Sequence, residues 1–270
     1  MPDSKEPAMP DSQWNTPSPG SMPLLMKDDV HVWYASLAPE RALLPEWIRL
    51  LSLQERLKAA AFPGEHTLKR YEACEMTREH YITYRGVLRG ILARYIGIAP
   101  AELIVRTHPA GKPYPDVSTG GDTLRFSSSH SWVHALIAVT YRRNVGIDLQ
   151  RINPNGNVEH IVENRFSLQA LAAFNALPPQ QRLLTFFRLW SLHEAYFKYL
   201  GGAASWKDFT ISLAAAPGKP AVLLEAPWEQ DTPAPCCLRE IDSGLPGYTA
   251  ALAVAGHDHR TSYWQWVREA

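Results

Sequence analysis

The feature that most constrains the fold is a pair of long segments, residues 78–96 and 178–200, in which apolar residues recur at helical spacing. In the first segment they form one stripe of Tyr81, Tyr84, Val87, Leu88, Ile91, Leu92 and Tyr95. Shorter runs rich in β-branched and aromatic residues lie before and after these helices, which indicates strands. Because the order of strand, helices and strands occurs twice, the sequence predicts an α+β fold of two similar α/β subdomains.

The chain of 270 residues divides into a tail and two halves. Six of its 22 prolines fall within residues 1–26, among Ser, Asp and Gly, which is typical of a segment that buries little apolar surface. We expect a disordered, proline-rich tail over residues 1–26, an N-terminal subdomain over 27–143 and a C-terminal subdomain over 144–270. Further helices are expected at 52–62, 158–166 and 168–177, and strands at 31–37, 103–107, 124–127, 135–141, 144–149, 209–213, 221–224, 248–254 and 263–267.

Charge and cysteine content exclude several classes of protein. Lys plus Arg and Asp plus Glu both number 27, and this zero net charge argues against a general nucleic-acid-binding protein. No apolar stretch is long enough to cross a bilayer, so no membrane partner is expected. Three cysteines, Cys74, Cys236 and Cys237, form neither a disulfide framework nor a CxxC zinc motif. We therefore expect a cytoplasmic monomer.

Several common catalytic motifs are absent. The chain has no GxxxxGK[ST] phosphate loop, no GxGxxG dinucleotide turn and no GxSxG nucleophile elbow. His193 and Glu194 begin like the zinc-protease HExxH motif, but Phe197 stands where the second imidazole is required. His257 and His259 could bind a metal, although a solvated turn explains them better.

The segment GIDLQ, residues 146–150, places two oxygen-bearing side chains on one face of an expected strand. Asp148 and Gln150 are two residues apart, so both point to the same side. Two converging oxygens suit a hard cation such as Mg²⁺. The alternative is a carboxylate that caps a strand end.

The expected helix at 178–200 carries His193, Glu194 and Lys198 within about one turn, with the last two spaced i, i+4. They could form an ordinary surface ion pair. Their neighbours are strongly apolar, however, so part of this helix should be buried, and a buried carboxylate needs a cation or donor beside it.

The segment FSSSHS, residues 126–131, lies between two expected strands, and residues 128–132 are expected to form a polar turn. Its hydroxyls and backbone N–H groups could cradle a phosphate. The alternative is a serine-rich hairpin turn without a ligand.

These motifs occur in one order: GKPYP at 111–115, FSSSHS, GIDLQ and then WSLHEAYFK at 190–198. The order and separations resemble those of the 4′-phosphopantetheinyl transferase superfamily, specifically its longer, single-chain, surfactin-synthetase-activating (Sfp-like) type, which carries GKP, FNxSHS, GIDxE and WxxKEAxxK. The resemblance covers roughly residues 52–213. It implies a pseudo-dimer of two α/β halves with the active site in the cleft between them.

The resemblance also implies an enzyme, a holo-[acyl-carrier-protein] synthase. Such enzymes bind coenzyme A as co-substrate and transfer its 4′-phosphopantetheine arm to a serine of an apo acyl or peptidyl carrier protein, releasing 3′,5′-ADP. They need Mg²⁺, or Mn²⁺ in its place. This chemistry needs a divalent ion and fixed cations around the phosphates, and a base beside the poorly nucleophilic serine.

Residue by residue, the resemblance assigns three sets of side chains. The implied metal ligands are Asp148, Gln150 and Glu194. The implied catalytic residues are Glu194, which helps to deprotonate the serine, Lys198, which contacts the transferring phosphate, and His193. The implied coenzyme A contacts are Arg56, Lys58, Arg85, Arg89, Lys112, Pro113, Ser128, Ser129 and His130.

Three residues depart from the family pattern. Gln150 replaces an acid and removes one negative charge from the metal site. His193 replaces a lysine, so we expect activity to depend steeply on pH between about 6 and 7.5. Ser127 replaces asparagine and is expected to alter only the turn.

Two alternative functions remain, of which the first follows from these departures and the second does not depend on the family. One is a coenzyme A or carrier-protein binding module with impaired catalysis. The other is a Mg²⁺-dependent hydrolase of pyrophosphates.

The expected helix at 78–96 carries basic residues and is the expected docking surface for an acidic carrier protein.

Overall fold

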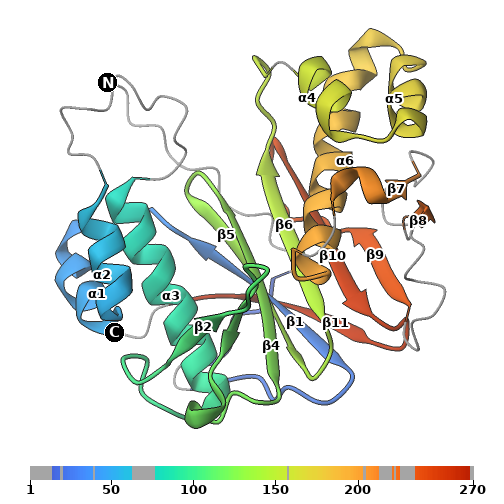
Figure 1. Ribbon diagram of the computed structural model, residues 1–270. Helices are drawn as coiled ribbons and strands as arrows, with labels where there is room; N and C mark the ends of the chain where they lie inside the picture. The colour runs from blue at the N-terminus through green and yellow to red at the C-terminus, as the bar shows by residue number, and fades with distance from the viewer. Residues whose placement is uncertain are drawn as a thin grey trace.

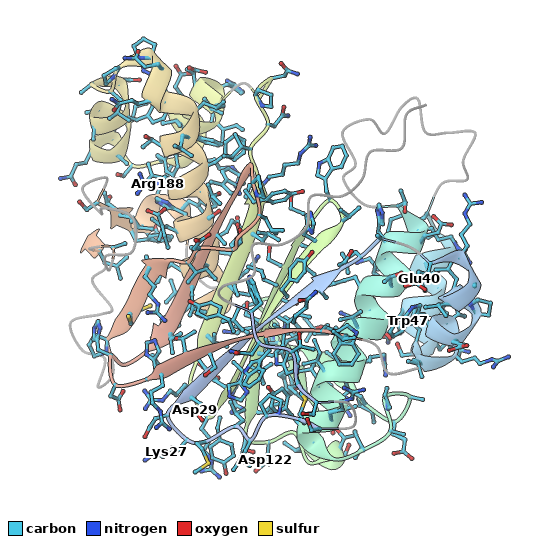
Figure 2. The ribbon with its side chains drawn as sticks, turned by 180° about the vertical axis from the view of Figure 1, so that it is seen from behind. Lys27, Asp29, Glu40, Trp47, Asp122 and Arg188 are labelled. Carbon is cyan, nitrogen blue, oxygen red and sulfur yellow. The ribbon has the colours of Figure 1, made fainter. Side chains whose placement is uncertain are left out.

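The computed structural model describes residues 14–18, 21–38, 40–62, 77–156, 158–202, 205–212, 221, 223–225 and 235–267. Two sheets lie at its centre, each covered by its own helices (Figure 1). The mixed α+β fold is as the sequence predicts. Seen from behind, Arg188 on one helical layer and Trp47 on the other lie at opposite sides of the molecule (Figure 2).

The first sheet has the strand order β11-β1-β5-β4. Its members are β1 (Asp29–Ser36), β4 (Leu124–Ser131), β5 (His134–Tyr141) and β11 (Arg260–Gln265). The hairpin of β4 and β5 and the pair of β1 and β5 are antiparallel, whereas β11 runs parallel to β1. The last strand of the chain therefore joins the sheet of the N-terminal half and does not follow the expected division at residues 143 and 144.

Helices cover one face of this sheet: α1 (Leu44–Leu50), α2 (Leu53–Ala60) and α3 (Arg78–Ile96). The apolar stripe of α3 packs on Trp33, Phe126 and Ile137 in a single core. Thr77 caps its first turn, and Gly97 ends it with a left-handed φ of 81°. Short elements complete this half: η1 (Arg41–Leu43), β2 (Val105–Thr107), β3 (Pro113–Pro115) and η3 (Val117–Thr119).

The second sheet has the order β6-β10-β9, all antiparallel, with β6 (Val145–Arg151), β9 (Cys236–Glu240) and β10 (Tyr248–Ala255). Helix α6 (Pro179–Tyr199) lies across it, and Arg188 of this helix holds Glu240 of β9 through two hydrogen bonds of 2.8 and 2.7 Å. The outer layer contains α4 (Val158–Arg165), α5 (Leu168–Asn175), η4 (Trp206–Asp208), β7 (Thr210–Ile211) and β8 (Leu223–Glu225).

The two sheets meet along β4 and β6, which we call the seam. Alternate serines of β4 bridge it: Ser127 Oγ accepts from the backbone N–H of Ile147 at 3.1 Å, and Ser131 Oγ accepts from that of Arg151 at 3.1 Å. Ser127 and Ser131 are buried, and an apolar core of residues from both sheets lies behind them. Side-chain hydroxyls thus join the two halves at this line.

The structure corrects two local predictions. Residues 128–131 are not a turn: β4 continues to Ser131 because its register with β5 runs unbroken to His134. The N-terminal tail is not loose throughout, since the Trp14 ring packs on Tyr34 and Tyr263 and its Nε1 donates to the carbonyl of Ser243. Residues 1–13 and Cys74 lie outside the described part of the chain.

Candidate active site

A glycine sets the contact between α6 and the seam. A Cβ at Gly146 would lie 2.5 Å from the backbone nitrogen of Tyr199 and would overlap the carbonyl of Ala195. Glycine therefore lets β6 lie directly against the helix backbone. This close approach brings Asp148 of β6 beside Lys198 of α6.

Asp148 is the centre of the site and is 4% exposed. Its Oδ1 accepts hydrogen bonds from Lys198 Nζ at 2.7 Å and from Ser129 Oγ at 2.8 Å. Lys198 Nζ also donates to the carbonyl of Ile147 at 3.1 Å. The other carboxylate oxygen, Oδ2, is buried and has no hydrogen-bond partner among the described residues. A buried carboxylate oxygen without a partner is costly unless a cation or donor binds it.

Glu194 lies one helical turn before Lys198 and is half-buried. Burial raises the pKa of its carboxyl above the ordinary value, and the nearby Asp148 raises it further, while Lys198 and Arg165 act in the opposite direction. A carboxyl held in this way can accept a proton more readily than an exposed one.

The donor set fits a hard divalent cation. Asp148 supplies an unpartnered oxygen, Glu194 a second carboxylate within electrostatic reach, and Gln150 an amide oxygen on the same face of β6. Oxygen ligands of this kind are those that Mg²⁺ takes, together with water and substrate phosphates. Within the described ranges, no group of three or more His, Cys, Asp and Glu residues gathers as a metal site, here or elsewhere, so the set relies on two carboxylates and the Gln150 amide.

A pocket of about 300 Å³ opens beside Lys198. Lys112, Pro113 and Ser128, which the sequence assigned to coenzyme A, line it together with Lys198. Lys112 Nζ donates to the carbonyls of Val145 at 2.9 Å and Tyr199 at 3.2 Å, and burial lowers its pKa to about 8. Lys112 therefore fastens the loop before β3 to the end of α6 and brings a cation to the pocket.

Sequence reasoning missed the two glycines at the far wall of this pocket. Gly201 and Gly202 follow α6 with φ of 77° and 81°, and a Cβ at Gly202 would lie 2.5 Å from the carbonyl of Ala110. The sequence signal for them was two adjacent glycines directly after a long expected helix. A second pocket of about 410 Å³ lies on the other side of Phe197 and is lined by Glu194, Arg165 and Lys207.

His193 does not belong to this site. It is 1% exposed, its ring stacks on Trp206 and Phe209, and its Nδ1 bonds to the carbonyl of Leu189 at 2.8 Å. Burial lowers its pKa to about 4. The expected catalytic role and the expected titration between pH 6 and 7.5 are therefore wrong, because the ring faces the core of the C-terminal half and stays neutral in that range.

Two further assignments change. Ser129 is 6% exposed and donates to Asp148, so it positions the acid instead of contacting coenzyme A. Arg89 is 2% exposed and donates to Glu55 and to the carbonyls of Pro100 and Leu103, which leaves it inside the fold.

The remaining predicted phosphate contacts lie on α2, α3 and β4. Arg85 is half-buried and, like Arg89, forms an ion pair with Glu55. Arg56 and Lys58 are exposed on α2, and Lys58 Nζ lies 5.5 Å from the centre of the Tyr81 ring. His130 lies on β4 with its ring 4.9 Å from that of Tyr84, which also bonds to Ser128 at 2.6 Å.

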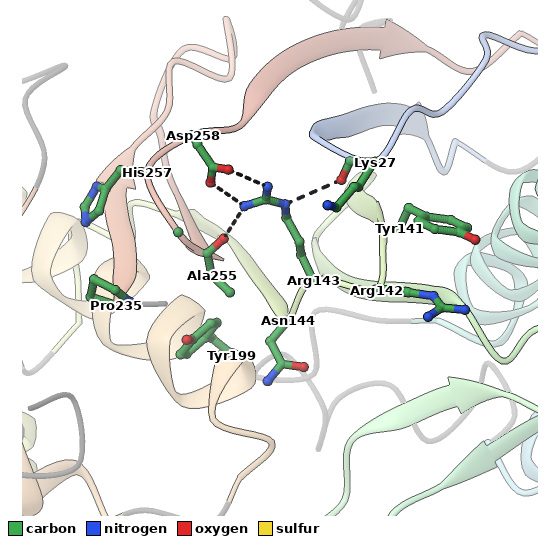
Figure 3. Close-up of a pocket in the computed structure, with 11 residues that line it drawn as sticks. Lys27, Tyr141, Arg142, Arg143, Asn144, Tyr199, Pro235, Ala255, His257 and Asp258 are labelled. Atoms are coloured by element: carbon green, nitrogen blue, oxygen red, sulfur yellow. Dashed lines mark hydrogen bonds and ion pairs between the residues drawn. The ribbon is translucent and has the colours of Figure 1, made fainter. Parts of the chain in front are cut away.

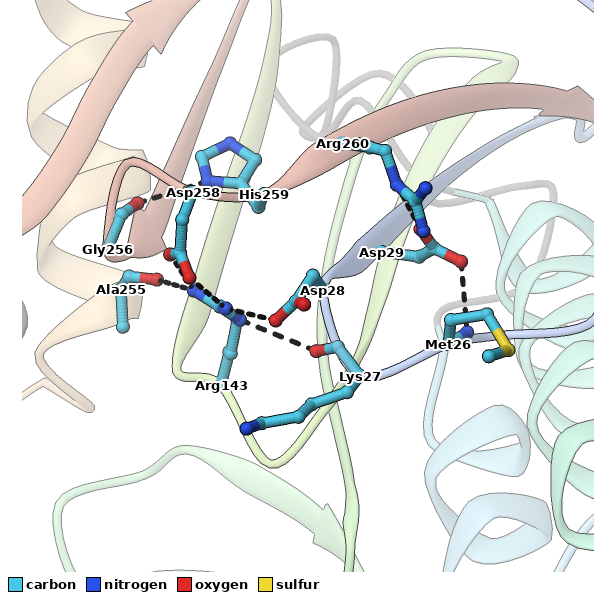
Figure 4. A network of polar contacts seen from close by, with 10 residues as sticks. All are labelled: Met26, Lys27, Asp28, Asp29, Arg143, Ala255, Gly256, Asp258, His259 and Arg260. Atoms are coloured by element: carbon cyan, nitrogen blue, oxygen red, sulfur yellow. Dashed lines mark hydrogen bonds and ion pairs between the residues drawn. The ribbon is translucent and has the colours of Figure 1, made fainter.

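A larger pocket, of about 1290 Å³, contains none of the predicted site residues. Arg143 lies in it and holds both oxygens of Asp258 at 2.6 and 2.9 Å (Figure 3). The same guanidinium bonds to Asp28 at 2.6 Å and to the carbonyl of Ala255 at 3.0 Å (Figure 4). This network ties the start of β1 to the turn between β10 and β11, and its one guanidinium is already paired with two carboxylates.

Two acids, Asp148 and Glu194, lie close to Lys198 beside the seam, and the adjoining pocket contains a second lysine, Lys112. This set of side chains has the chemistry of an enzyme that acts on a phosphorylated substrate. Residues 144–253 match the family model described as the 4′-phosphopantetheinyl transferase superfamily. Over 255 residues the chain is 31% identical to the 4′-phosphopantetheinyl transferase HetI of Nostoc sp., covering 93% of this chain and 97% of that protein. The chain belongs to the 4′-phosphopantetheinyl transferase superfamily.

Two other relatives match shorter parts. The 4′-phosphopantetheinyl transferase AcpT of Salmonella typhimurium is 34% identical over 101 residues, 37% of this chain and 50% of that protein. The holo-[acyl-carrier-protein] synthase of Thermotoga maritima, a solved structure, is 18% identical with a TM-score of 0.30, covering 43% of this chain and 64% of that chain. No described helix is long and apolar enough to span a membrane.

Proposed function

We propose that the protein transfers the 4′-phosphopantetheine arm of coenzyme A to a serine of an apo acyl or peptidyl carrier protein and releases 3′,5′-ADP. The observation that carries the proposal is the unpartnered Oδ2 of buried Asp148, set beside Glu194 and Lys198. An acid buried in this way could hold a divalent cation, which would neutralise charge on substrate phosphates. The match of nearly the whole chain to HetI supports the same activity.

The proposed residues divide the chemistry among themselves. Asp148, Glu194 and Gln150 would hold Mg²⁺, or Mn²⁺, which when bound neutralises charge on the pyrophosphate. Lys112, Pro113 and Ser128 line the pocket proposed for coenzyme A. The phosphate contacts proposed outside this lining are Arg56, Lys58, Arg85 and His130. Lys198 provides a cation for the phosphate that moves.

In the proposed step, the serine oxygen forms a bond to the phosphorus that carries pantetheine. The bond from that phosphorus to the bridging oxygen breaks, and this oxygen leaves on 3′,5′-ADP. Glu194 would take the serine proton, because its carboxylate lies beside Asp148 and Lys198 at the site. Positioning and charge neutralisation then account for the rest of the catalysis.

The finer family type is also a proposal. A single chain with two sheets joined at a seam supports the Sfp-like, pseudo-dimeric arrangement, acting as a cytoplasmic monomer with the cleft between the halves. We prefer an active transferase to a binding module that has lost catalysis, because Asp148, Glu194 and Lys198 lie together in the structure.

The test is to incubate the protein with Mg²⁺, coenzyme A and several apo carrier proteins and to measure intact masses. We expect at least one carrier to gain a single phosphopantetheine arm, and Asp148→Asn to lose this transfer by about 10²- to 10³-fold. Cleavage of coenzyme A without any carrier would identify a pyrophosphate hydrolase instead. An Asp148→Asn variant with wild-type transfer would refute the site.

A further inference from the structure

An exposed aromatic ring and a cation form a platform at the tip of the β4–β5 hairpin. Trp132 is 45% exposed, and the guanidinium carbon of Arg151 lies 3.8 Å from the centre of its ring. Ser131 Oγ, the residue before Trp132, accepts from the backbone N–H of Arg151. Both members of this Trp132–Arg151 platform are therefore fixed to the seam.

The two-residue loop between Ser131 and His134 calls for a left-handed residue at its first position, which accounts for the backbone of Trp132 but not for its exposed ring. Trp132 has a φ of 54°, a left-handed conformation that a bulky side chain rarely adopts and that glycine would accept without strain. Arg151 forms no ion pair with a carboxylate among the described residues. A strained, exposed tryptophan beside an unmatched cation is more typical of a binding surface than of a stabilising turn.

The platform lies at one end of the active site. Along β4 and β6, the contacts run from Ser127 with Ile147, through Ser129 with Asp148, to Ser131 with Arg151. The pocket proposed for coenzyme A lies at the Ser127 end. Trp132 lies three residues beyond Ser129, which at strand spacing is about 10 Å from the acid.

The acceptor serine has to reach the phosphate near Asp148 while it is still part of a folded protein. The surface around that serine must then lie on the rim of the site, close to the reacting atoms. The pocket proposed for coenzyme A lies at the Ser127 end, and His130, also assigned to coenzyme A, points to the face of β4 opposite Ser129 and Ser131. The platform end on the Ser131 side is therefore left for the acceptor. An aromatic face with a guanidinium above it fits an apolar patch flanked by a carboxylate.

We propose that the Trp132–Arg151 platform docks the acidic, partly apolar surface next to the acceptor serine of the carrier protein. This inference rests on the proposed transferase function and adds the surface that selects the acceptor. It replaces the expectation that α3 faces the carrier. Most residues of α3 are buried, and two of its arginines, Arg85 and Arg89, are already paired with Glu55.

The experiment measures transfer rates against carrier concentration and, separately, against coenzyme A concentration. Trp132→Gly removes the ring while accepting the positive φ, and Arg151→Gln removes the charge at similar length. We expect each to raise the KM for the apo carrier by about 10-fold, with the KM for coenzyme A within twofold of wild type. For Arg151→Gln, the dependence of the carrier KM on salt should also weaken.

The turn between β5 and β6 offers a matched control. Arg142 has a φ of 61° and lies 5.6 Å from the centre of the Tyr141 ring, so it too combines a left-handed backbone with a cation near an aromatic ring. Arg142→Gln and Tyr141→Ala should leave the KM for the carrier unchanged. A carrier variant with an acidic residue near its serine changed to lysine should restore binding to Arg151→Glu.

The outcomes separate this inference from the proposed function. If wild-type protein modifies the carrier while Trp132→Gly and Arg151→Gln keep the wild-type KM, the platform is not the docking surface. An equal effect in the Arg142→Gln control would also overturn it. Absence of transfer by wild-type protein on every carrier would instead overturn the proposed function. Thermal melting with coenzyme A present checks that each variant is folded.

Discussion

Gly146→Ala tests whether close packing of α6 on β6 assembles the site. The new Cβ would lie 2.5 Å from Tyr199 N and 3.0 Å from the carbonyl carbon of Ala195, and nearer still to its oxygen. Since ordinary contacts of this kind begin near 3.4 Å, α6 has to retreat from β6 by more than about 1 Å. These neighbours are backbone atoms and cannot rotate away.

Two effects of different size follow. Overpacking of this type costs about 1–3 kcal/mol of the free energy of unfolding, which for a chain of this length lowers Tm by about 2–10 °C. The site should suffer more, because Lys198 holds Asp148 at 2.7 Å across the same contact. A misplacement of about 1 Å near reacting groups can cost about 10²-fold in rate.

The assay compares initial rates of carrier modification by intact mass with thermal melting of the same samples. Gly156→Ala is the control, since its Cβ would meet Asn153 O at 3.4 Å and Val158 Cγ1 at 3.7 Å, both ordinary contacts. We expect Gly146→Ala to lose about 100-fold in rate at a temperature where it is fully folded, and Gly156→Ala to behave as wild type. A folded Gly146→Ala protein with the wild-type rate would refute the reasoning.

Three other changes have defined outcomes. Because burial raises the pKa of Glu194 in the protein without a bound cation, the Mg²⁺ concentration that gives half-maximal rate should rise as pH falls through that raised value, and Glu194→Gln should lose this pH dependence as well as most activity. Burial lowers the pKa of His193 in the folded protein from its ordinary value of 6.5 to about 4, so this residue contributes stability above pH 6.5 that is lost as pH falls toward 4. This loss amounts to about 3 kcal/mol, and urea unfolding at several pH values should show a shallower decline for His193→Gln. Glu55→Gln leaves Arg85 and Arg89 without their carboxylate and should cost about 3–5 kcal/mol in urea unfolding; a cost below about 1 kcal/mol would show that the pair is not a structural tie.

The sequence predicted helices better than strand ends, for physical reasons. Residues 78–96 match α3 at both ends because a continuous stripe, a capping threonine and a left-handed glycine all mark the same element. Residues 128–131 were expected to turn because serine favours turns locally. Pairing with β5 outweighs that preference, and no local pattern shows such pairing.

The same contrast holds for the site. Asp148, Glu194 and Lys198 could be singled out by type and spacing, and the structure brings them together. His193 could not be judged from sequence, since one step along a helix turns a side chain by about 100° and takes it from the site into the core. Arg89 was misassigned because its partner, Glu55, lies 34 residues away in the chain.

Three alternating serines of β4 join the two sheets at the seam, and this is a different role from the turn expected for this segment. In a continuous sheet, neighbouring strands bond through backbone groups and leave no space between them. Here Ser127 and Ser131 bridge β4 to β6 by hydroxyls that accept backbone N–H groups, while Ser129 between them donates to the Asp148 carboxylate. Serine side chains stand between the two strands, which leaves room for the Asp148 carboxylate between the sheets. Their hydroxyls still provide hydrogen-bond partners for the backbone N–H groups of Ile147 and Arg151. The same joint that holds the halves together therefore positions the acid, and its far end carries the Trp132–Arg151 platform.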